Sequence, residues 1–297
     1  MRIDPFKIKG PAVISFSGGR TSAYMLYRLA QVTDLSAGDV RVMFANTGKE
    51  REETLVFVNE VARRWGIEIE WLEYVRRYLP RYKSSETAER CAAIQERAAR
   101  EHKRTYEPAN GRKEPGYRVV TFETASRNGE PFDNMIDLNG LPNRSLRMCT
   151  AEMKIRVIKK RMLDRGFSYW DCVLGLRADE PDRVVSKRAT TRERWEHLMP
   201  LADAGITEDD VMAFWAQQPF DLGLGQHEGN CDLCFLKTPA KKQRIVSRDP
   251  LVVDWWATAE DRTGSKFRPN EPPLRSLVRL PVIQDDGASS LDCFCTN

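Results

Sequence analysis

The stretch VISFSGGRTSAYML, residues 13–26, passes from apolar, partly β-branched residues through Ser-Gly-Gly into a helix-like pattern. A strand that ends in paired glycines and reopens as a helix leaves unpaired backbone N–H groups at the turn, and the positive end of the helix dipole points the same way. Phosphate groups bind in that geometry, and Ser17, Thr21 and Ser22 add hydroxyl donors near it. An ordinary βα turn with a serine cap shows the same pattern, so the turn alone leaves both interpretations open.

The surroundings of this turn favour the phosphate interpretation. Strand-like patterns at 12–16, 39–48 and 67–74 alternate with helix-like patterns at 21–31 and 51–66. That order predicts an α/β fold with a doubly wound parallel sheet, in which ligands bind at the carboxyl ends of the strands. The Ser-Gly-Gly turn follows such an end.

The pattern changes after this alternation. Residues 75–143 lose the regular pattern, and we expect them to form an insertion that covers the site. Four further elements are expected: a helix at 149–166, a strand that leads into a charged loop within 169–183, an amphipathic helix at 205–218 capped by Thr207, and a helix at 249–262. We therefore expect a nucleotide-binding α/β domain at 1–203 and a C-terminal region with paired cysteines at 204–297.

Composition limits the class of protein. With 297 residues, 41% hydrophobic and 30% charged, the chain can bury a sizeable core. No apolar run approaches the length of a membrane span, and the first residues lack the apolar segment of a signal peptide, so we expect a cytoplasmic protein with no membrane partner. Basic residues cluster at 154–165 and 237–244, where a solvated face and a nucleic-acid patch are both open interpretations.

The seven cysteines are distributed unevenly. In a chain expected to be cytoplasmic they argue against a disulfide framework. Cys91 and Cys172 lie alone in regular patterns and are most simply buried apolar residues. The other five lie in turn-rich segments: Cys149, Cys231, Cys234, Cys293 and Cys295. The CxxC spacing is typical of a metal knuckle or a redox dithiol, and a zinc site built from the last four cysteines is one interpretation.

Five segments, in order, resemble motifs of the PAPS reductase family within the adenine-nucleotide α-hydrolase (PP-loop) superfamily. The segments are SFSGGRTS, ANTGKEREETLVFVNEVARRWGIEIEWL, GLRADEPDR, MPLADAGITEDDVMAFWAQQ and HEGNCDLCF, which together cover most of residues 12–236. The resemblance implies a Rossmann-like fold that binds ATP with Mg²⁺, and catalytic roles for Arg177 and Lys154. It implies that the nucleotide is bound by Ser15, Ser17, Gly18, Gly19, Arg20, Thr21, Ser22, Asn46, Thr47, Gly48, Gly175, Arg177, Glu180 and Arg183.

Two features depart from the family pattern. Typical pyrophosphate loops read Ser-Gly-Gly-x-Asp-Ser, but Thr21 stands at the Asp position, which leaves open how Mg²⁺ is held; Arg20 before it could offset phosphate charge. True sulfonucleotide reductases resemble one another in a C-terminal Glu-Cys-Gly-x-His motif, whereas this chain ends in LDCFCTN. Reduction of PAPS therefore loses its main support.

The resemblance also assigns the cysteines. In iron–sulfur relatives, cysteines before a basic helix join a later CxxC to hold a [4Fe–4S] cluster. Cys149 resembles the first site with one cysteine missing, and Cys231 and Cys234 resemble the second. Cys293 is the expected fourth ligand, although Cys295 or an open iron position are alternatives. Thiolates suit this iron chemistry, and zinc is the other candidate metal.

The function implied is an ATP-pyrophosphatase-type sulfur-transfer enzyme that adenylates an acceptor for sulfur insertion. DNA, as in phosphorothioation, or RNA are the acceptors suggested, with a cysteine desulfurase or another sulfur donor as partner. One alternative is a PAPS or APS reductase with an altered tail. Another is a non-catalytic nucleotide-binding subunit of a modification complex, since Thr21 departs from the loop pattern. The sequence leaves the oligomeric state open.

Overall fold

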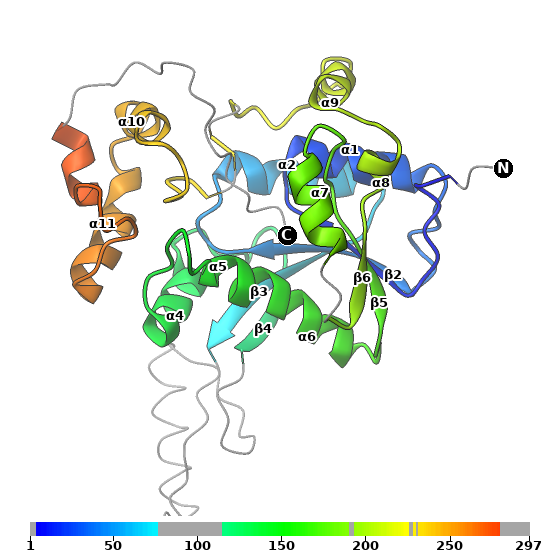
Figure 1. The fold of residues 1–297 in the computed structure, drawn as a ribbon, viewed down its shortest axis with the longest axis horizontal. Coiled ribbons are helices and arrows are strands. Elements are labelled where there is room, and N and C mark those ends of the chain that lie inside the picture. The colour runs from blue at the N-terminus through cyan, green and yellow to red at the C-terminus, as the bar shows by residue number, and fades with distance from the viewer. Residues whose placement is uncertain (1–3, 77–114, 190–192, 226–227, 230, 280–297) are drawn as a thin grey trace, which may run out of the picture.

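The fold is built around a six-stranded sheet in the order β4-β3-β2-β1-β5-β6 (Figure 1). The computed structural model describes residues 4–76, 115–189, 193–225, 228–229 and 231–279. The strands are β1 (Ala12–Phe16), β2 (Val40–Asn46), β3 (Ile69–Arg76), β4 (Pro115–Val120), β5 (Trp170–Val173) and β6 (Trp195–Leu198). All neighbouring pairs are parallel except β3–β4. The predicted doubly wound α/β fold is confirmed.

The edge strand β4 is antiparallel to β3 and was not predicted. It falls within the stretch that the sequence suggested as an insertion, together with helix α4 (Glu130–Asn139). In this stretch residues 77–114 lie outside the described residues, so the predicted covering role of that part stays a prediction. The described remainder extends the sheet and packs against it.

The sheet separates two hydrophobic cores, because alternate residues of each strand face opposite sides. Ile14 and Phe44 face a core shared with α1 (Arg20–Ala30) and α2 (Glu52–Trp65). Val13 and Met43 face the other core. The helices on that second side are α4, α5 (Met148–Thr150), the π-helical turn η1 (Ala151–Ile155) and α6 (Arg156–Asp164).

Helix α9 (Glu208–Trp215) packs on α1 and α2. Its predicted cap is confirmed, since Thr207 and Asp210 form a reciprocal capping box. The Trp215 ring lies 5.0 Å from that of Phe57, centroid to centroid, and its Nε1 donates to the carbonyl of Arg20 at 3.0 Å. The division at residue 203 stays a prediction, and this packing favours a boundary further along the chain.

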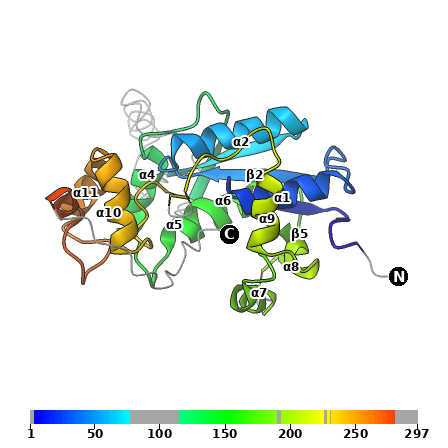
Figure 2. The same cartoon turned by 90° about the horizontal axis from the view of Figure 1, so that it is seen from above.

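The C-terminal helices gather at one end of the molecule beside α4 (Figures 1 and 2). They are α10 (Pro239–Arg248), α11 (Val252–Thr263) and the 3₁₀ helix η2 (Leu274–Arg279), whereas α7 (Pro181–Arg188) and α8 (Pro200–Asp203) lie at the other end with α9. The helix predicted at 249–262 is confirmed by α11. None of the helices in the described ranges is long and apolar enough to cross a membrane.

The register of the strands brings three loops to one edge of the sheet. Phe16 of β1 lies opposite Phe44 of β2, and Ile14 lies opposite Val173 of β5. Because these strands are parallel neighbours, the segments that follow them leave the sheet side by side. The edge carries the Ser-Gly-Gly turn between the loop after β2 and the loop after β5.

Candidate nucleotide and sulfur site

The loop between β1 and α1 is held closed by two serines. Ser22 Oγ accepts a hydrogen bond from the backbone N–H of Ser17 at 3.3 Å and donates to the carbonyl of Gly19 at 3.0 Å. Ser17 Oγ lies 2.9 Å from Ser22 Oγ and therefore donates to it. Ser22 is buried, so these two hydroxyls shape the turn from within.

The two glycines of this loop have different reasons to be glycine. Gly18 has φ +75°, and a Cβ there would stand 2.8 Å from Thr54 Cγ2 and 3.0 Å from Val58 Cγ2. Gly19 has an ordinary φ of −101°, and its nearest neighbour would be Ser17 Oγ at 3.6 Å. Gly19 is the N-cap of α1, and no side chain caps the first N–H groups of the helix there. Gly18 is required by the fold, whereas Gly19 keeps space for an approaching group.

Arg20 is directed to the chain after α9. Its Nε and Nη2 donate to the two carboxylate oxygens of Asp221 at 2.7 and 2.5 Å, and its Nη1 donates to the carbonyl of Leu224 at 2.8 Å. This bidentate contact lowers the pKa of Asp221 below its usual value. The Asp221 carboxylate therefore already neutralises the guanidinium that was expected to offset phosphate charge.

Arg177 joins the loop after β5 to the Ser-Gly-Gly turn. Its Nη1 donates to Thr21 Oγ1 at 3.3 Å, its Nε to Asp179 at 2.9 Å and its Nη2 to Glu208 at 3.1 Å. Burial alone would lower the pKa of Arg177, but the hydrogen bond to Asp179 and the nearby carboxylates outweigh it and raise the pKa. The guanidinium therefore stays charged next to the residue that replaces the usual aspartate.

The other predicted residues of this loop support Arg177 or the turn. Glu180 accepts a hydrogen bond from the backbone N–H of Arg177 at 3.0 Å and pairs with Arg183. A Cβ on Gly175 would lie 3.1 Å from the Cα of Ser22, so the strand end and α1 touch closely there. The structure thus brings Gly175, Arg177 and the turn together, as predicted for one site.

Ser15 lies apart from this cluster. It lines a cavity of about 30 Å³ whose walls include Trp170, Cys172, Trp195 and Lys187. Burial raises the pKa of the Cys172 thiol to about 12 and keeps that cysteine protonated. The proposed contact of Ser15 with nucleotide stays a prediction.

The loop after β2 is buried and fully hydrogen-bonded. Asn46 donates to Glu73 at 2.7 Å and accepts from the backbone N–H of Gly48 at 3.0 Å. The Thr47 hydroxyl lies 2.8 and 2.9 Å from the two carboxylate oxygens of Glu50, and its backbone N–H donates to the same group at 2.8 Å. These residues form a rigid wall beside the Ser-Gly-Gly turn.

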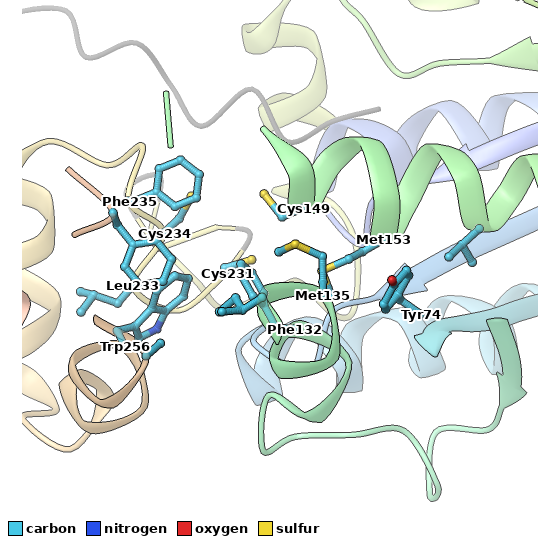
Figure 3. Packing of buried hydrophobic residues seen from close by; sticks show 14 of the residues in the cluster. Tyr74, Phe132, Met135, Cys149, Met153, Cys231, Leu233, Cys234, Phe235 and Trp256 are labelled. Carbon is cyan, nitrogen blue, oxygen red and sulfur yellow. The ribbon is translucent and has the colours of Figure 1, made fainter. Parts of the chain in front are cut away.

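The three described cysteines of the predicted cluster lie in one hydrophobic core. Cys149, Cys231 and Cys234 are 7%, 5% and 2% exposed and belong to the same buried cluster. Figure 3 shows Cys149 at the start of α5, on the side that faces the loop carrying Cys231 and Cys234. Within the described ranges, no three His, Cys, Asp or Glu side chains form a group that could hold a metal ion. Cys293 lies outside the described residues.

Three lysines on the segments that carry or follow these cysteines are buried. Lys154, Lys237 and Lys242 are 7%, 4% and 1% exposed. Lys237 Nζ donates to the carbonyls of Gly229 and Cys231 at 2.8 and 2.7 Å. Burial lowers the pKa of Lys242, which Glu271 opposes as its ion-pair partner. Buried ammonium groups favour anionic neighbours, so this environment fits thiolates and the negative charge of an iron–sulfur cluster in its chemistry.

Many of the basic side chains on α6 and α10 form ion pairs with acidic residues of the same chain. On α6 the cations form ion pairs: Arg156–Glu152, Lys159–Glu193, Lys160–Asp164, Arg161–Glu70 and Arg165–Glu70. On α10, Lys242 pairs with Glu271 and Arg248 with Glu228. The interpretation as a solvated or internally paired face gains support from these contacts.

Several residues of the site were missed in the sequence. Glu50 could have been found, because Thr47 and Glu50 have the Thr-x-x-Glu spacing of a local capping motif. Asp221 could not, since its contact with Arg20 spans 201 positions. Lys237 and Lys242 lie in a run that resembles a solvated basic segment, and only the tertiary fold buries them.

Comparison with known proteins identifies relatives of the whole α/β part. Residues 11–220 match the sequence model of the phosphoadenosine phosphosulfate reductase domain. An uncharacterized nin region protein of Escherichia phage lambda is 30% identical over 233 residues, covering 77% of this chain and 67% of that protein. An uncharacterized protein of Methanocaldococcus jannaschii is 43% identical over 63 residues, covering 21% of this chain and 12% of that protein.

Among solved structures, the U34-tRNA thiolase NcsA from Methanococcus maripaludis, with its [4Fe–4S] cluster, aligns over 94% of this chain and 72% of its own. The TM-score is 0.37 and the sequence identity 12%. So low a TM-score does not establish a common fold. The cluster of that protein is therefore no evidence about this chain.

The two loop glycines give a matched pair of variants. Gly18→Ala is expected to lower the free energy of unfolding by about 2 kcal/mol, because a side chain at positive φ is strained and its Cβ meets Thr54. Gly19→Ala is expected to change it by less than about 0.5 kcal/mol. Urea denaturation of both variants measures the difference, and equal stabilities would contradict the distinction.

Proposed function

The chain belongs to the phosphoadenosine phosphosulfate reductase domain family, and from that premise we propose that it is an ATP-pyrophosphatase-type sulfur-transfer enzyme. One observation carries the proposal above others: the open, uncapped start of α1 at Gly19, beside the charged guanidinium of Arg177. A polyphosphate at that position would meet backbone N–H donors, the helix dipole and a cation together.

The proposed nucleotide has its phosphates on residues 17–22 and its adenosine along the end of β2. An acceptor oxygen would attack the α-phosphorus, forming a new P–O bond while the bond to the β-phosphate oxygen breaks and pyrophosphate leaves. A sulfur nucleophile would then attack the acceptor atom that carries this oxygen, so that a bond to sulfur forms, the bond to the adenylated oxygen breaks and AMP leaves with that oxygen. The chain would contribute positioning and charge stabilisation, with Arg177 and the loop N–H groups facing the developing charge.

Mg²⁺ is proposed to enter with the phosphates of the nucleotide. The loop offers the hydroxyl of Thr21 where relatives have a carboxylate, and that hydroxyl accepts from Arg177. Mg²⁺ is commonly bound through substrate phosphates and retained waters, with few protein ligands. A single hydroxyl at Thr21 fits an Mg²⁺ ion bound mainly by phosphates and waters better than one bound by protein groups alone.

For sulfur delivery we propose that Cys149, Cys231 and Cys234 hold a [4Fe–4S] cluster, with Cys293 as fourth ligand. Support comes from the thiol donor set, its burial in one core and the buried lysines beside it. With Cys293 bound, all four irons would have a protein ligand; if that position is open instead, the fourth iron could carry sulfide. A zinc site at the CxxC is the alternative. The catalytic role proposed for Lys154 would be exerted from η1, where its Nζ lies 4.0 Å from the Glu50 carboxylate.

The acceptor proposed is nucleic acid, either RNA or the DNA backbone, in the cytoplasm, with a cysteine desulfurase as one class of sulfur donor. The alternatives are a PAPS or APS reductase, which the family description favours, and a non-catalytic nucleotide-binding subunit. Release of pyrophosphate from ATP, with and without nucleic acid, separates the three. A reductase would consume a sulfonucleotide instead, and a non-catalytic subunit would bind ATP without turnover.

Gly19→Leu is expected to weaken ATP binding at least about tenfold, because its side chain would occupy the space through which phosphates approach the helix start. Isothermal calorimetry measures the affinity. Gly229→Ala is the control, since a Cβ there also meets open space, and it should bind ATP as the unaltered chain does. Undiminished affinity in Gly19→Leu would contradict the proposed cradle.

Arg177→Ala is expected to reduce pyrophosphate release by about a hundredfold, as removal of a donor that faces developing charge does in other enzymes. The control is Arg188→Ala, which removes an exposed pair with Asp203. A steady-state pyrophosphate assay compares them. If Arg177→Ala keeps both turnover and ATP affinity, its cluster of carboxylates is only a structural ion-pair network.

Cys149→Ser is expected to remove iron and acid-labile sulfide from protein purified without oxygen. Cys172→Ser is the matched control, because that cysteine lines the separate cavity beside Ser15 and should leave the iron content unchanged. Iron and acid-labile sulfide are measured in both variants, and an absorption spectrum shows whether the cluster is present. Stoichiometric zinc that survives Cys149→Ser would contradict the cluster and support a zinc site.

A further inference from the structure

The loop that joins β2 to α2, residues 47–51, contacts the loop of the CxxC motif directly. Glu50 and Cys231 form an antiparallel bridge between the two backbones. The backbone N–H of Asp232 donates to the carbonyl of Lys49 at 2.7 Å, and Lys49 Nζ pairs with the Asp232 carboxylate at 2.9 Å. Both side chains are largely buried, so the pair is held in a low-dielectric setting.

A single hydroxyl links the nucleotide edge to the cysteine. Thr47 Oγ1 lies within 2.9 Å of both Glu50 oxygens and 3.6 Å from Cys231 Sγ. A threonine hydroxyl has one proton, so it can donate to Glu50 or to sulfur but not fully to both. A movement of the Glu50 carboxylate would therefore change the hydrogen bond that Thr47 makes with Cys231 Sγ. A change at the sulfur atom would likewise change the hydrogen bond between Thr47 and Glu50.

The loop is fixed on its other side to the sheet edge. Gly48 N–H donates to Asn46, and the carbonyl of Gly48 accepts from Gly129 at 2.9 Å. Gly48 has φ +77°, and a Cβ there would lie 2.9 Å from both Pro131 and Ser126. The loop thus has little freedom to adjust at one end without moving at the other.

We propose that residues 47–50 couple nucleotide binding to the accessibility of Cys231. The inference rests on the proposed function, in that it takes nucleotide to bind at the end of β2. Cys231 is buried, so a reagent reaches it only when this loop and the CxxC loop separate. Nucleotide that binds the closed arrangement reduces the open population, and by linkage the state of Cys231 alters nucleotide affinity by the same factor. Thr47 and Glu50 act here as positioning residues.

The test is alkylation of the full chain by iodoacetamide after a chelator has removed any bound metal, since a metal-bound cysteine is not alkylated. The reaction is run with and without ATP and followed residue by residue with peptide mass spectrometry. At an ATP concentration about a hundred times the dissociation constant, labelling of Cys231 is expected to slow at least about tenfold. Labelling of Cys172 is expected to stay the same, because it lies in a separate cavity. Calorimetry on the same sample measures ATP binding.

One variant weakens the contact between the two loops without changing residues 47–50. Asp232→Asn keeps the acceptor for Trp256 Nε1, which lies 2.7 Å from Asp232 Oδ1, but loses the charge that pairs with Lys49. In this variant Cys231 is expected to label faster, and protection by ATP to fall below about threefold. Asp203→Asn, which loses only an exposed pair, should behave as the unaltered chain does.

The outcomes separate the two proposals. If ATP binds and Cys231 is labelled at an unchanged rate, the coupling is overturned and the proposed function stands. If ATP does not bind, the proposed function fails and this inference fails with it. If ATP slows the labelling of Cys172 as much as that of Cys231, the protection is global stabilisation and the coupling is overturned.

Discussion

The buried ion pair between Lys49 and Asp232 joins the loop after β2 to the CxxC loop, beside the backbone bridge of Glu50 with Cys231. Each charge is expensive to bury alone, so removing one partner would leave the other uncompensated. Lys49 also lies over the ring of Trp255 on α11, at 5.1 Å from its centroid. Hydrophobic packing tolerates sliding, but this pair and the bridge at Glu50 fix how the C-terminal region lies against the strand edge.

The fold was predictable where the signal is local. The strand at 12–16, the turn after it and the helix of α2, which ends at Gly66, follow from apolar spacing and glycine position. Strands β4 and β6 were missed; both lie at edges of the sheet, and β4 pairs antiparallel with β3 after a long separation in sequence. The helix at 149–166 was predicted, but its π-helical turn was not, since no residue pattern marks one.

The site was predictable where a motif carries it and not where tertiary contacts decide its electrostatics. Sequence placed Arg177 beside the turn, and the structure shows the contact through Thr21. No local pattern indicates that Arg20 pairs with Asp221, or that Glu70 pairs with both Arg161 and Arg165. The sequence shows how many charged side chains a segment has, but not which of them form ion pairs in the fold. Which charges remain open to a phosphate depends on partners tens of residues away.

In the proposed function, the Ser-Gly-Gly turn and the cysteines belong to one site. Phosphate chemistry needs fixed donors, which the closed Ser17–Ser22 pair and the start of α1 provide. Thiolate chemistry would need buried positive charge; Lys154, Lys237 and Lys242 are buried, although Lys242 pairs with Glu271 and Lys237 donates to two backbone carbonyls. These demands conflict if they share one set of cations, because a lysine neutralised by phosphate no longer stabilises a thiolate. Residues 47–51 follow the end of β2 and contact the CxxC loop, so one short loop connects the two parts of the proposed site.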